Sequence, residues 1–509
     1  MSKSLPARPN LEQLRNQAKD LLKSLKSSDP VAFQRLQENH PSSSTAVKNH
    51  ADPFSLSNAQ LVIAREYGFA SWPKLKEHVE SLQPETGDPI ELLKQAFHAN
   101  DAPRLRQLLN RYPEFKAKLN DPIGPFDSPV ITNVRTREML DVLLEAGADL
   151  NARSRWWAGG FGLLHSAEPD LATYAIQRGA VVDVHAAARL GLIDKLRQLI
   201  AANPSLVHAR GGDGQMPLHF ASTVEIAKFL LDQGADIDAR DVDHESTAAQ
   251  WMIRERTEVA RYLVQRGCQA DLLLAAALGD ADLVHKLLDA DPVGVNLRVS
   301  DEYFPRTNHR SGGTIYQWTL GWHISPHEVA KQFGHDHVFR LLMERSTADV
   351  KLLAAAWLGD AAAVKSLLAD HAGLVTRLSP SARRQIAHAA RNNNPAAVRV
   401  MLAAGWPVTA LGQHRATPLH WAAFHGNAEM IHEILRYHPP MELADADFQA
   451  TPLGWAIHGS VHGWHCRTGD YAAAVELLLK RGAKLPGKTS DATEAVKKVL
   501  RRFGAENAD

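Results

Sequence analysis

Apolar residues recur along most of this chain in short helical blocks that are punctuated by glycine and proline. Residues 415–435, RATPLHWAAFHGNAEMIHEIL, contain two such blocks, and the first of them ends at Gly426. Pro418 stands where a first helical turn tolerates a missing N–H, and Thr417 can cap that helix. Ala422 is small enough to let a neighbouring helix approach closely. The pattern therefore predicts a pair of short helices as the structural unit.

Both ends of this unit recur elsewhere in the chain. Helix starts similar to the one at Thr417 occur at residues 163–167, 216–221, 247–251 and 451–455. Helix ends recur as LEAGADLN, QRGAVVD, LDQGADIDA, QRGCQAD and KRGAKL. We expect the glycine of each such segment to adopt the left-handed conformation that closes a helix and turns the chain outward into a finger. These glycines are Gly147, Gly179, Gly234, Gly267 and Gly482.

The Thr-Pro-Leu-His tetrad at residues 417–420 resembles the T-P-L-H-x-A signature of the ankyrin repeat, a unit of about 33 residues. This resemblance covers residues 86–509 and implies an all-α solenoid of about 11–13 partly degenerate units with short β-hairpin fingers. In this family the tetrad histidine ties one repeat to the next by hydrogen bonds. The resemblance therefore implies structural roles for His165, His219 and His420.

Residues 1–85 do not follow the repeat. Their apolar positions predict one helix over residues 11–25, a second that starts at Ser57, and a third over residues 74–82. We expect a helical capping region that covers the first repeat, as solenoids require. Residues 58–79 also resemble a DNA-binding helix-turn-helix, so a regulator with a DNA-binding N-terminal segment is an alternative. The segment lacks the basic stripe that such binding needs.

Bulk composition narrows the classes of function. Lys+Arg and Asp+Glu are equal at 57 each, which argues against electrostatic capture of nucleic acid or of an anionic membrane. The chain has no apolar run of about 18 residues and no apolar signal segment at its start. Only two cysteines occur, Cys268 and Cys466, which favours a reducing compartment. We expect a cytoplasmic protein of bacterial type that needs no cofactor.

The position after the tetrad histidine is aromatic in four units, at Phe220, Trp251, Trp421 and Trp455. In the family this position begins the inner helix, near the base of the fingers. One interpretation is a ladder of rings along a concave groove, which would supply anchors for a partner. The other is that the rings pack between repeats.

An insertion at residues 301–325 interrupts the period, and insertions in solenoids tend to decorate the binding side. Its density of aromatic and polar side chains predicts that it either plugs the solenoid or builds a pocket. The candidate ligand-binding residues within it are Tyr316, Trp318, Trp322 and His323.

A second insertion spans residues 458–470, HGSVHGWHCRTGD. If it were helical, three of its histidines would share one face, with chemistry that suits zinc. Gly459 and Gly463 weaken such a helix, and no acidic residue stands nearby in sequence to orient the rings. The alternative is a polar loop whose Trp464 docks on a neighbouring repeat. The candidate ligands are His458, His462, His465 and Cys466.

The function that this pattern favours is a scaffold for protein–protein interaction through a concave groove and loops, with another protein as partner. The alternative is an enzyme or small-molecule binder whose pocket is formed by the two insertions. No nucleophile elbow, phosphate loop or H-E-x-x-H motif occurs. The candidate binding residues are Trp251, Trp421, Trp455, Tyr316, Trp318, Trp322, His323, His462, Trp464 and His465.

Overall fold

A computed structural model describes residues 3–6, 9–40, 55–81, 88–463, 468–485 and 491–505. Its contacts separate two compact units: residues 1–121 with 134–149, and residues 122–133 with 150–509. The sequence-based boundary near residue 85 lies outside the described residues. The division into a capping region and a solenoid at that point therefore stays a prediction.

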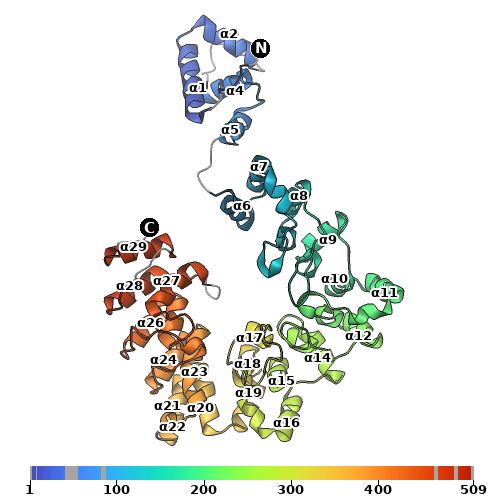
Figure 1. Cartoon of the computed structure of the whole chain (residues 1–509), viewed down its shortest axis with the longest axis vertical. Coiled ribbons are helices and arrows are strands. Elements are labelled where there is room, and N and C mark those ends of the chain that lie inside the picture. The colour runs from blue at the N-terminus through green and yellow to red at the C-terminus, as the bar shows by residue number, and fades with distance from the viewer. Residues whose placement is uncertain are drawn as a thin grey trace. The chain divides into compact units, whose positions relative to one another are not determined.

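Four helices at the start of the first unit share a small apolar core (Figure 1). Leu14, Leu21 and Val62 lie in this core, and the buried Glu66 carboxylate pairs with Arg35 and Lys3. The three expected helices are confirmed, and a further one starts at Pro30. Asp29 caps this helix and proline is tolerated in its first turn, so Asp-Pro begins a helix here. The helices are α1 (Leu11–Lys26), α2 (Pro30–Asn39), α4 (Leu56–Glu66) and α5 (Trp72–Ser81).

Three more α-helices complete the first unit, with a short 3₁₀ helix between the second and the third. Each α-helix begins at an aspartate or threonine whose side chain accepts a backbone N–H of the first turn. The elements are α6 (Pro89–His98), α7 (Ala102–Arg111), η1 (Pro113–Lys118) and α8 (Arg137–Glu145).

The second unit is a series of short helices that follow one another in chain order, from green to red in Figure 1. Among the described residues of the chain, none of the helices has both the length and the apolar character needed to cross a bilayer. The α-helices are α9 (Pro169–Gln177), α10 (Val184–Arg189), α11 (Ile193–Ala202), α12 (Val224–Asp232), α13 (Ala248–Trp251), α14 (Thr257–Gln265), α15 (Leu272–Leu278), α16 (Ala281–Ala290), α17 (Tyr316–Thr319), α18 (Pro326–Gln332), α19 (Asp336–Glu344), α20 (Ala348–Trp357), α21 (Ala361–Asp370), α22 (Leu374–Arg377), α23 (Pro380–Arg391), α24 (Pro395–Ala403), α25 (Pro418–Phe424), α26 (Ala428–Leu435), α27 (Pro452–His462), α28 (Tyr471–Lys480) and α29 (Glu494–Arg502). The 3₁₀ helices are η2 (Pro125–Asp127), η3 (Val130–Asn133), η4 (Leu163–His165), η5 (Pro204–His208), η6 (Gly212–Gly214), η7 (Pro217–Phe220), η8 (Pro292–Asn296) and η9 (Gln413–Arg415).

The predicted helix pair at residues 415–435 is present as α25 and α26. Ala422 and Ala423 are fully buried, and α25 packs against α23 on one side and α27 on the other. Gly459 lies inside α27 where this helix crosses α25. A Cβ atom there would meet the carbonyl oxygen of Phe424 at 2.5 Å. The glycine that we expected to weaken a helix is therefore what allows the two helices to touch.

The tetrad histidines hold one repeat to the next, as the family resemblance implied. The imidazole Nδ1 of His420 accepts the backbone N–H of Thr417 at 3.1 Å, and its Nε2 lies 3.2 Å from the carbonyl oxygen of Ala450 in the next finger. His219 bonds to Met216 and Ser246 in the same way. Each ring thus closes its own helix start and fixes the loop that follows.

A glutamine performs the same task where the histidine is missing. The side-chain oxygen of Gln250 accepts the backbone N–H of Thr247 at 2.9 Å, and its nitrogen donates to Asp271 at 3.1 Å. What the repeat requires at this position is therefore one acceptor and one donor on a rigidly held side chain, and not an imidazole as such.

The outward turns are confirmed at each predicted helix end. Gly147, Gly179, Gly234, Gly267 and Gly482 all have φ between +90° and +103°. The fingers that follow are hairpin-like loops, and the described residues show isolated bridges instead of extended strands. One bridge joins Arg153 to Gly162, and another joins Arg240 to Thr247.

The insertion at residues 301–325 forms a closed loop on the second unit. Its two ends meet because the Val299 N–H donates to Ile324 O at 3.0 Å and the His323 N–H donates to Val299 O at 2.8 Å. Its middle docks on the finger around Asp243, whose carbonyl oxygen accepts the Gly312 N–H at 2.9 Å. The insertion is therefore an ordered part of the array.

Replacing Gly234 with alanine tests the left-handed helix end. A Cβ atom at Gly234 would meet nothing within 4 Å, so any loss must come from its φ of +90°. We expect Gly234→Ala to lower the free energy of unfolding by about 1–2 kcal/mol. Gly234→Asn, which tolerates this conformation better, should lose less. Urea unfolding followed by circular dichroism measures both, and equal losses would contradict the explanation.

Replacing His219 with glutamine tests the buried imidazole. Burial lowers the pKa of His219 to about 4, from 6.5 when the ring is exposed. The unfolded chain therefore binds more protons between pH 6.5 and pH 4. Stability from this group is full above pH 6.5 and falls, at up to about 1.4 kcal/mol per pH unit, as the pH drops through this window. We expect His219→Gln, which copies Gln250, to reduce the pH slope of the urea midpoint. His285→Gln, at an exposed histidine, is the control and should leave the slope unchanged.

Candidate functional site

Two of the predicted anchor tryptophans donate hydrogen bonds to the finger that precedes them. The indole Nε1 of Trp455 donates to Asp445 at 2.9 Å, and that of Trp251 donates to Asp241 at 3.3 Å. In both cases the aspartate stands ten residues before the tryptophan and also accepts backbone N–H groups of its own turn. These indoles are thus part of the hydrogen-bonding that shapes the fingers.

The expected groove ladder exists as a set of ring contacts, but its rings are buried. Trp421 and Trp455 meet edge to face with centroids 4.9 Å apart and are only 4% and 6% exposed. The guanidinium of Arg391 lies 5.5 Å from the ring centres of both Trp421 and Trp322. The expectation of open anchors at Trp421 and Trp455 is therefore wrong for this structure, because the rings pack between repeats.

Trp421 differs from Trp251 and Trp455 in one respect. The position ten residues before it is Leu411, which supplies no carboxylate, and the buried Nε1 of Trp421 has no hydrogen-bond partner among the described residues. A tryptophan at this position therefore donates a hydrogen bond to its finger only where that finger supplies an aspartate.

Within the first insertion, only one of the four candidate residues is open to solvent. Trp318 is 60% exposed and packs against His244 with ring centroids 6.4 Å apart. Tyr316 is fully buried and its hydroxyl donates to Asp271 at 3.1 Å, while Trp322 is buried beneath Arg391. His323 is also enclosed, stacked on His388 with ring centroids 3.5 Å apart. The expectation that Tyr316, Trp322 and His323 face a ligand is therefore wrong for this structure.

The insertion nevertheless builds a pocket, as one of the two predictions proposed. A cavity of about 390 Å³ lies between the finger at residues 240–247, the next finger at residues 269–271, and insertion residues 303–314. Tyr303, Phe304 and Pro305 form an apolar wall. Arg240 and Arg306, both exposed, add two guanidinium groups to the lining.

The carboxylates at this pocket are already engaged within the protein. Although burial alone would raise it, backbone N–H groups of Thr307 and Asn308 lower the pKa of Glu245. Burial raises the pKa of Asp271, whose oxygens accept hydrogen bonds from Gln250, Tyr316 and the first turn of α15. The groups left to meet a ligand are chiefly cationic and apolar.

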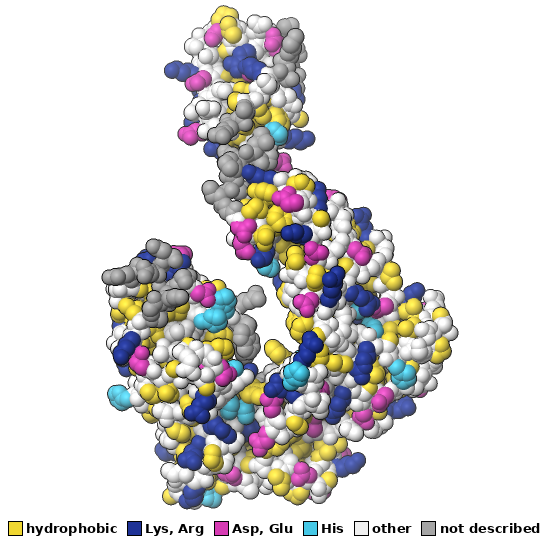
Figure 2. All heavy atoms as spheres, viewed as in Figure 1, with side chains coloured by type: hydrophobic (Ala, Val, Ile, Leu, Met, Phe, Trp, Pro, Cys, Tyr) yellow, Lys and Arg dark blue, Asp and Glu magenta, His cyan; other side chains and the backbone are white. Residues whose placement is uncertain are grey.

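Charges elsewhere on the surface are mixed. Figure 2 shows Lys and Arg side chains interspersed with Asp and Glu over the face in view. This agrees with the formal net charge of zero for the whole chain. The two arginines at the pocket are therefore a local concentration of positive charge on a protein without net charge.

The second insertion is partly described. Helix α27 extends to His462, so His458 and His462 lie one turn apart with ring centroids 4.5 Å apart. Asp491 approaches both, at 2.9 Å from His462 Nε2 and 3.7 Å from His458 Nδ1. An acidic partner that we did not expect from nearby sequence is thus supplied 29 residues downstream. All three side chains are exposed. The other candidates, Trp464, His465 and Cys466, lie outside the described residues.

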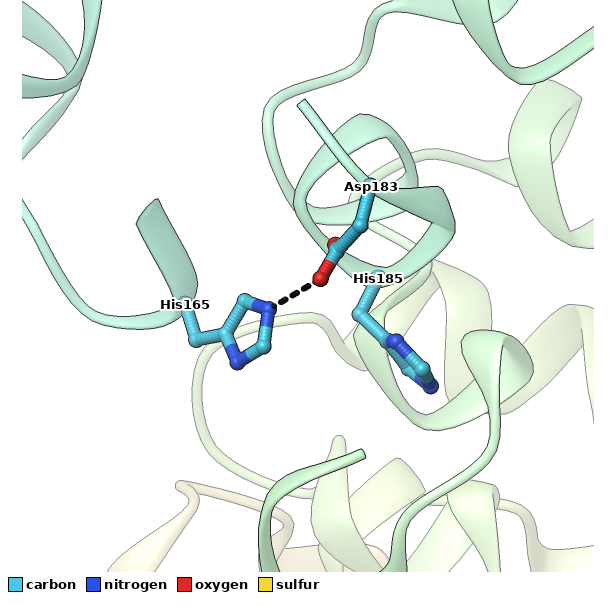
Figure 3. Close-up of side chains that lie close together, drawn as sticks. All are labelled: His165, Asp183 and His185. Carbon is cyan, nitrogen blue, oxygen red and sulfur yellow. Dashed lines mark hydrogen bonds and ion pairs between the residues drawn. The ribbon is translucent and has the colours of Figure 1, made fainter. Parts of the chain in front are cut away.

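A histidine–aspartate cluster at His165, Asp183 and His185 also has ligand atoms within 4.8 Å of one another (Figure 3). His165 Nε2 bonds to Asp183 at 2.9 Å while its Nδ1 accepts the Gly162 N–H. His185 Nε2 is 2.9 Å from the carbonyl oxygen of Ala209, and Asp183 also pairs with Arg153. These bonds repeat the pattern of His219 and His420, so the cluster is explained by the repeat itself.

A third cluster was not anticipated from the sequence. Asp213, Asp243 and His244 place ligand atoms within 4.8 Å of one another where two successive fingers meet the docked insertion. Burial, together with the carboxylates of Asp243 and Asp241, raises the pKa of Asp213 to about 7 against a lowering by His244. Each residue is an ordinary finger residue in sequence, so no local signal marks the site.

Comparison with known proteins gives a family and limited similarity beyond it. The family model "Ankyrin repeats (3 copies)" matches residues 184–273, 352–451 and 386–489. One segment of 49 residues is 45% identical to serine/threonine-protein kinase VIK of Arabidopsis thaliana and covers 9% of this chain and 11% of that protein. The chain thus spans about a tenth of that kinase. The crystal structure of the human ASB11 ankyrin repeat domain aligns with 53% of this chain and 100% of that domain, at 17% identity and a TM-score of 0.24.

The matched residues contain the tetrad at residues 417–420, the outward-turning glycines Gly234, Gly267 and Gly482, and the bridging histidines His219 and His420. Ankyrin repeats generally serve as scaffolds for protein–protein interaction. On the family model together with these features, the chain is an ankyrin-repeat protein.

Proposed function

We propose that this protein binds a partner protein through the pocket between the finger at residues 240–247 and the insertion. The observation that supports this proposal most is the cavity of about 390 Å³ with two exposed guanidinium groups and an apolar wall. Ligand pockets of a few hundred Å³ are large enough to receive one or two side chains of a peptide. The pocket is thus the described feature that best fits recognition.

The partner segment should carry an acidic side chain beside an apolar one. The guanidinium of Arg240 donates to the carbonyl oxygen of Glu245 at 2.6 Å, and among the described residues none of its hydrogen bonds goes to a carboxylate. Arg306 pairs with the exposed carboxylate of Asp301 at 3.3 Å and donates to the carbonyl oxygen of Ser311 at 3.5 Å. Arginine presents a planar fork that suits a carboxylate, and such contacts are stronger than neutral hydrogen bonds.

Trp318 supplies the exposed aromatic surface next to this pocket. It packs on His244, which itself lines the pocket, and more than half of its side chain is open to solvent. Large aromatic side chains that become buried on binding are over-represented among energetically important contacts. We therefore place the centre of the interface at Trp318, Arg240 and Arg306, and not on the buried rings of Trp421 and Trp455.

A small molecule is the second candidate occupant. The same volume and the same mixture of apolar and cationic groups would accept a small acidic ligand. Such a ligand would fill the cavity without contacting Trp318. Dependence of binding on Trp318 therefore separates the two candidates.

Selection from a displayed random-peptide library, with the full chain as bait, tests the proposal. We expect enriched peptides to pair an acidic residue with a large apolar one. Arg240→Glu should weaken binding of a synthetic consensus peptide by at least about tenfold, because it replaces attraction by repulsion. Trp318→Ala should weaken it by a similar factor. Fluorescence anisotropy with the labelled peptide measures both changes.

Phe448→Ala is the matched control. Phe448 is 64% exposed, close to the 60% of Trp318, and lies on a different finger beside His414 and Trp455. We expect it to bind the consensus peptide as the parent does. Loss of binding in Phe448→Ala together with full binding in Trp318→Ala would move the interface to the C-terminal fingers and contradict the proposal.

A further inference from the structure

The finger cluster is preorganised by close backbone packing. Asp213 has a φ of +54°, a conformation that aspartate tolerates better than most residues. Its two neighbours must be glycines, because a Cβ atom on Gly212 would meet the Phe161 ring at 2.2 Å and one on Gly214 would meet Val242 at 2.3 Å. The carbonyl oxygen of Asp213 accepts the N–H groups of Val242 and Asp243. The backbone at Asp213 is therefore held in place.

The carboxylates of this cluster are buried without cations. Asp213 is 9% exposed and Asp243 is 6% exposed. Among the described residues, neither has an arginine or lysine within ion-pair distance. Asp243 Oδ1 accepts the Gly312 N–H at 3.0 Å, and the described residues make no hydrogen bond of ordinary length to the Asp213 carboxyl, although the indole of Trp156 interacts with it. Two buried carboxylates without a counter-charge carry a large desolvation penalty.

His244 is oriented as a ligand would be. Its Nδ1 lies 2.9 Å from the carbonyl oxygen of Gly313, which can only accept, so Nδ1 carries the proton. In the neutral ring the lone pair is then on Nε2, which faces Asp243 Oδ2 at 3.9 Å. Metal-binding histidines usually have their other ring nitrogen held by a carbonyl or carboxylate in this way. The insertion, through Gly313, is what sets this orientation.

We propose that Asp213, Asp243 and His244 bind a divalent first-row transition metal ion at the junction of the two fingers and the insertion. One imidazole nitrogen and two carboxylate oxygens form a donor set that suits zinc, manganese or ferrous iron. Two negative charges match one divalent cation. The fourth position of a tetrahedral ion is left for water.

The ligand atoms lie within 4.8 Å of one another, so each separation would have to close by at most about 1.4 Å to reach that of a tetrahedral ion. A tetrahedral zinc ion with bonds of about 2.0–2.1 Å places its ligand atoms roughly 3.4 Å apart. The separation of His244 Nε2 and Asp243 Oδ2 would have to close by about half an ångström from 3.9 Å. The ion would join the finger at residues 210–215 to the finger at residues 240–247 and, through His244, to Gly313. It would thus fasten one wall of the proposed binding pocket, but the site does not depend on that proposal.

The proposal does not extend to the other two histidine–aspartate clusters. Both ring nitrogens of His165 and the Nε2 atom of His185 are occupied by the hydrogen bonds of the repeat. The exposed cluster of His458, His462 and Asp491 could capture zinc on the surface in a binding assay. The experiment therefore uses the full chain with His458→Ala and His462→Ala as its background.

Zinc titration of this background protein, stripped with a chelator and followed by calorimetry, tests the site. We expect one equivalent of zinc to bind. Asp213→Asn and Asp243→Asn, which keep the shape of each side chain, should each weaken binding at least about tenfold. Asp183→Asn, in the cluster explained by the repeat, is the matched control and should bind as the background does. Absence of zinc binding in the background, or unchanged binding in both finger variants, would overturn the proposal.

A second measurement needs no variant in the fingers. Zinc should slow amide hydrogen exchange of residues 241–246 and of Gly312 in the background protein, because the ion bridges the elements that carry them. It should also raise the midpoint of thermal unfolding, as any ligand of the native state does. Slower exchange confined to other repeats would overturn the assignment. Circular dichroism of each variant in chelator shows that it is folded before zinc is added.

Discussion

Where the repeats carry His219 or His420, one side chain satisfies two backbone groups at once. A helix start leaves N–H groups without partners, and a finger leaves carbonyl groups without partners. His420 accepts from the first and contacts the second across the boundary between repeats. Because the ring has only one orientation that does both, the angle between successive repeats is fixed along with the hydrogen bonds. Gln250 also accepts the N–H of its helix start but donates to the Asp271 carboxylate, which identifies paired acceptance and donation, and not the ring, as the constraint.

The finger tryptophans extend this constraint outward. The carboxylates of Asp241 and Asp445 accept backbone N–H groups of their own turns. The indoles of Trp251 and Trp455, on the helices that follow, donate to the same carboxylates. A finger built in this way is rigid enough to carry the docked insertion and the pocket beside it. The aromatic rings at these positions consequently stabilise the fingers that line the pocket and are not themselves the exposed surface of that pocket.

The repeat architecture was predictable from sequence because its signals are local. The Thr-Pro-Leu-His tetrad at residues 417–420 and the glycine at position 234 each determine the backbone within a few residues. The aspartate ten residues before Trp251 and Trp455 is also visible in the sequence, and it distinguishes finger-locking rings from Trp421. The solvent exposure of single side chains was not predictable. Tyr316 and Trp318 stand two residues apart on one short helix, yet the first is buried and the second is exposed to solvent. The cluster of Asp213, Asp243 and His244 depends on where an insertion docks about 70 residues downstream, and no local pattern contains that information.

Contacts in a helical-repeat array ordinarily join only adjacent repeats, so its stability propagates from neighbour to neighbour. The insertion departs from this rule. Gly312 bonds to Asp243 at one end, while the carbonyl oxygen of Trp322 accepts from Asn392 at the other. Sequence positions about 150 residues apart are thereby joined through a single loop. The repeats between them should consequently melt as one cooperative block, with fraying confined to the two flanks of the array.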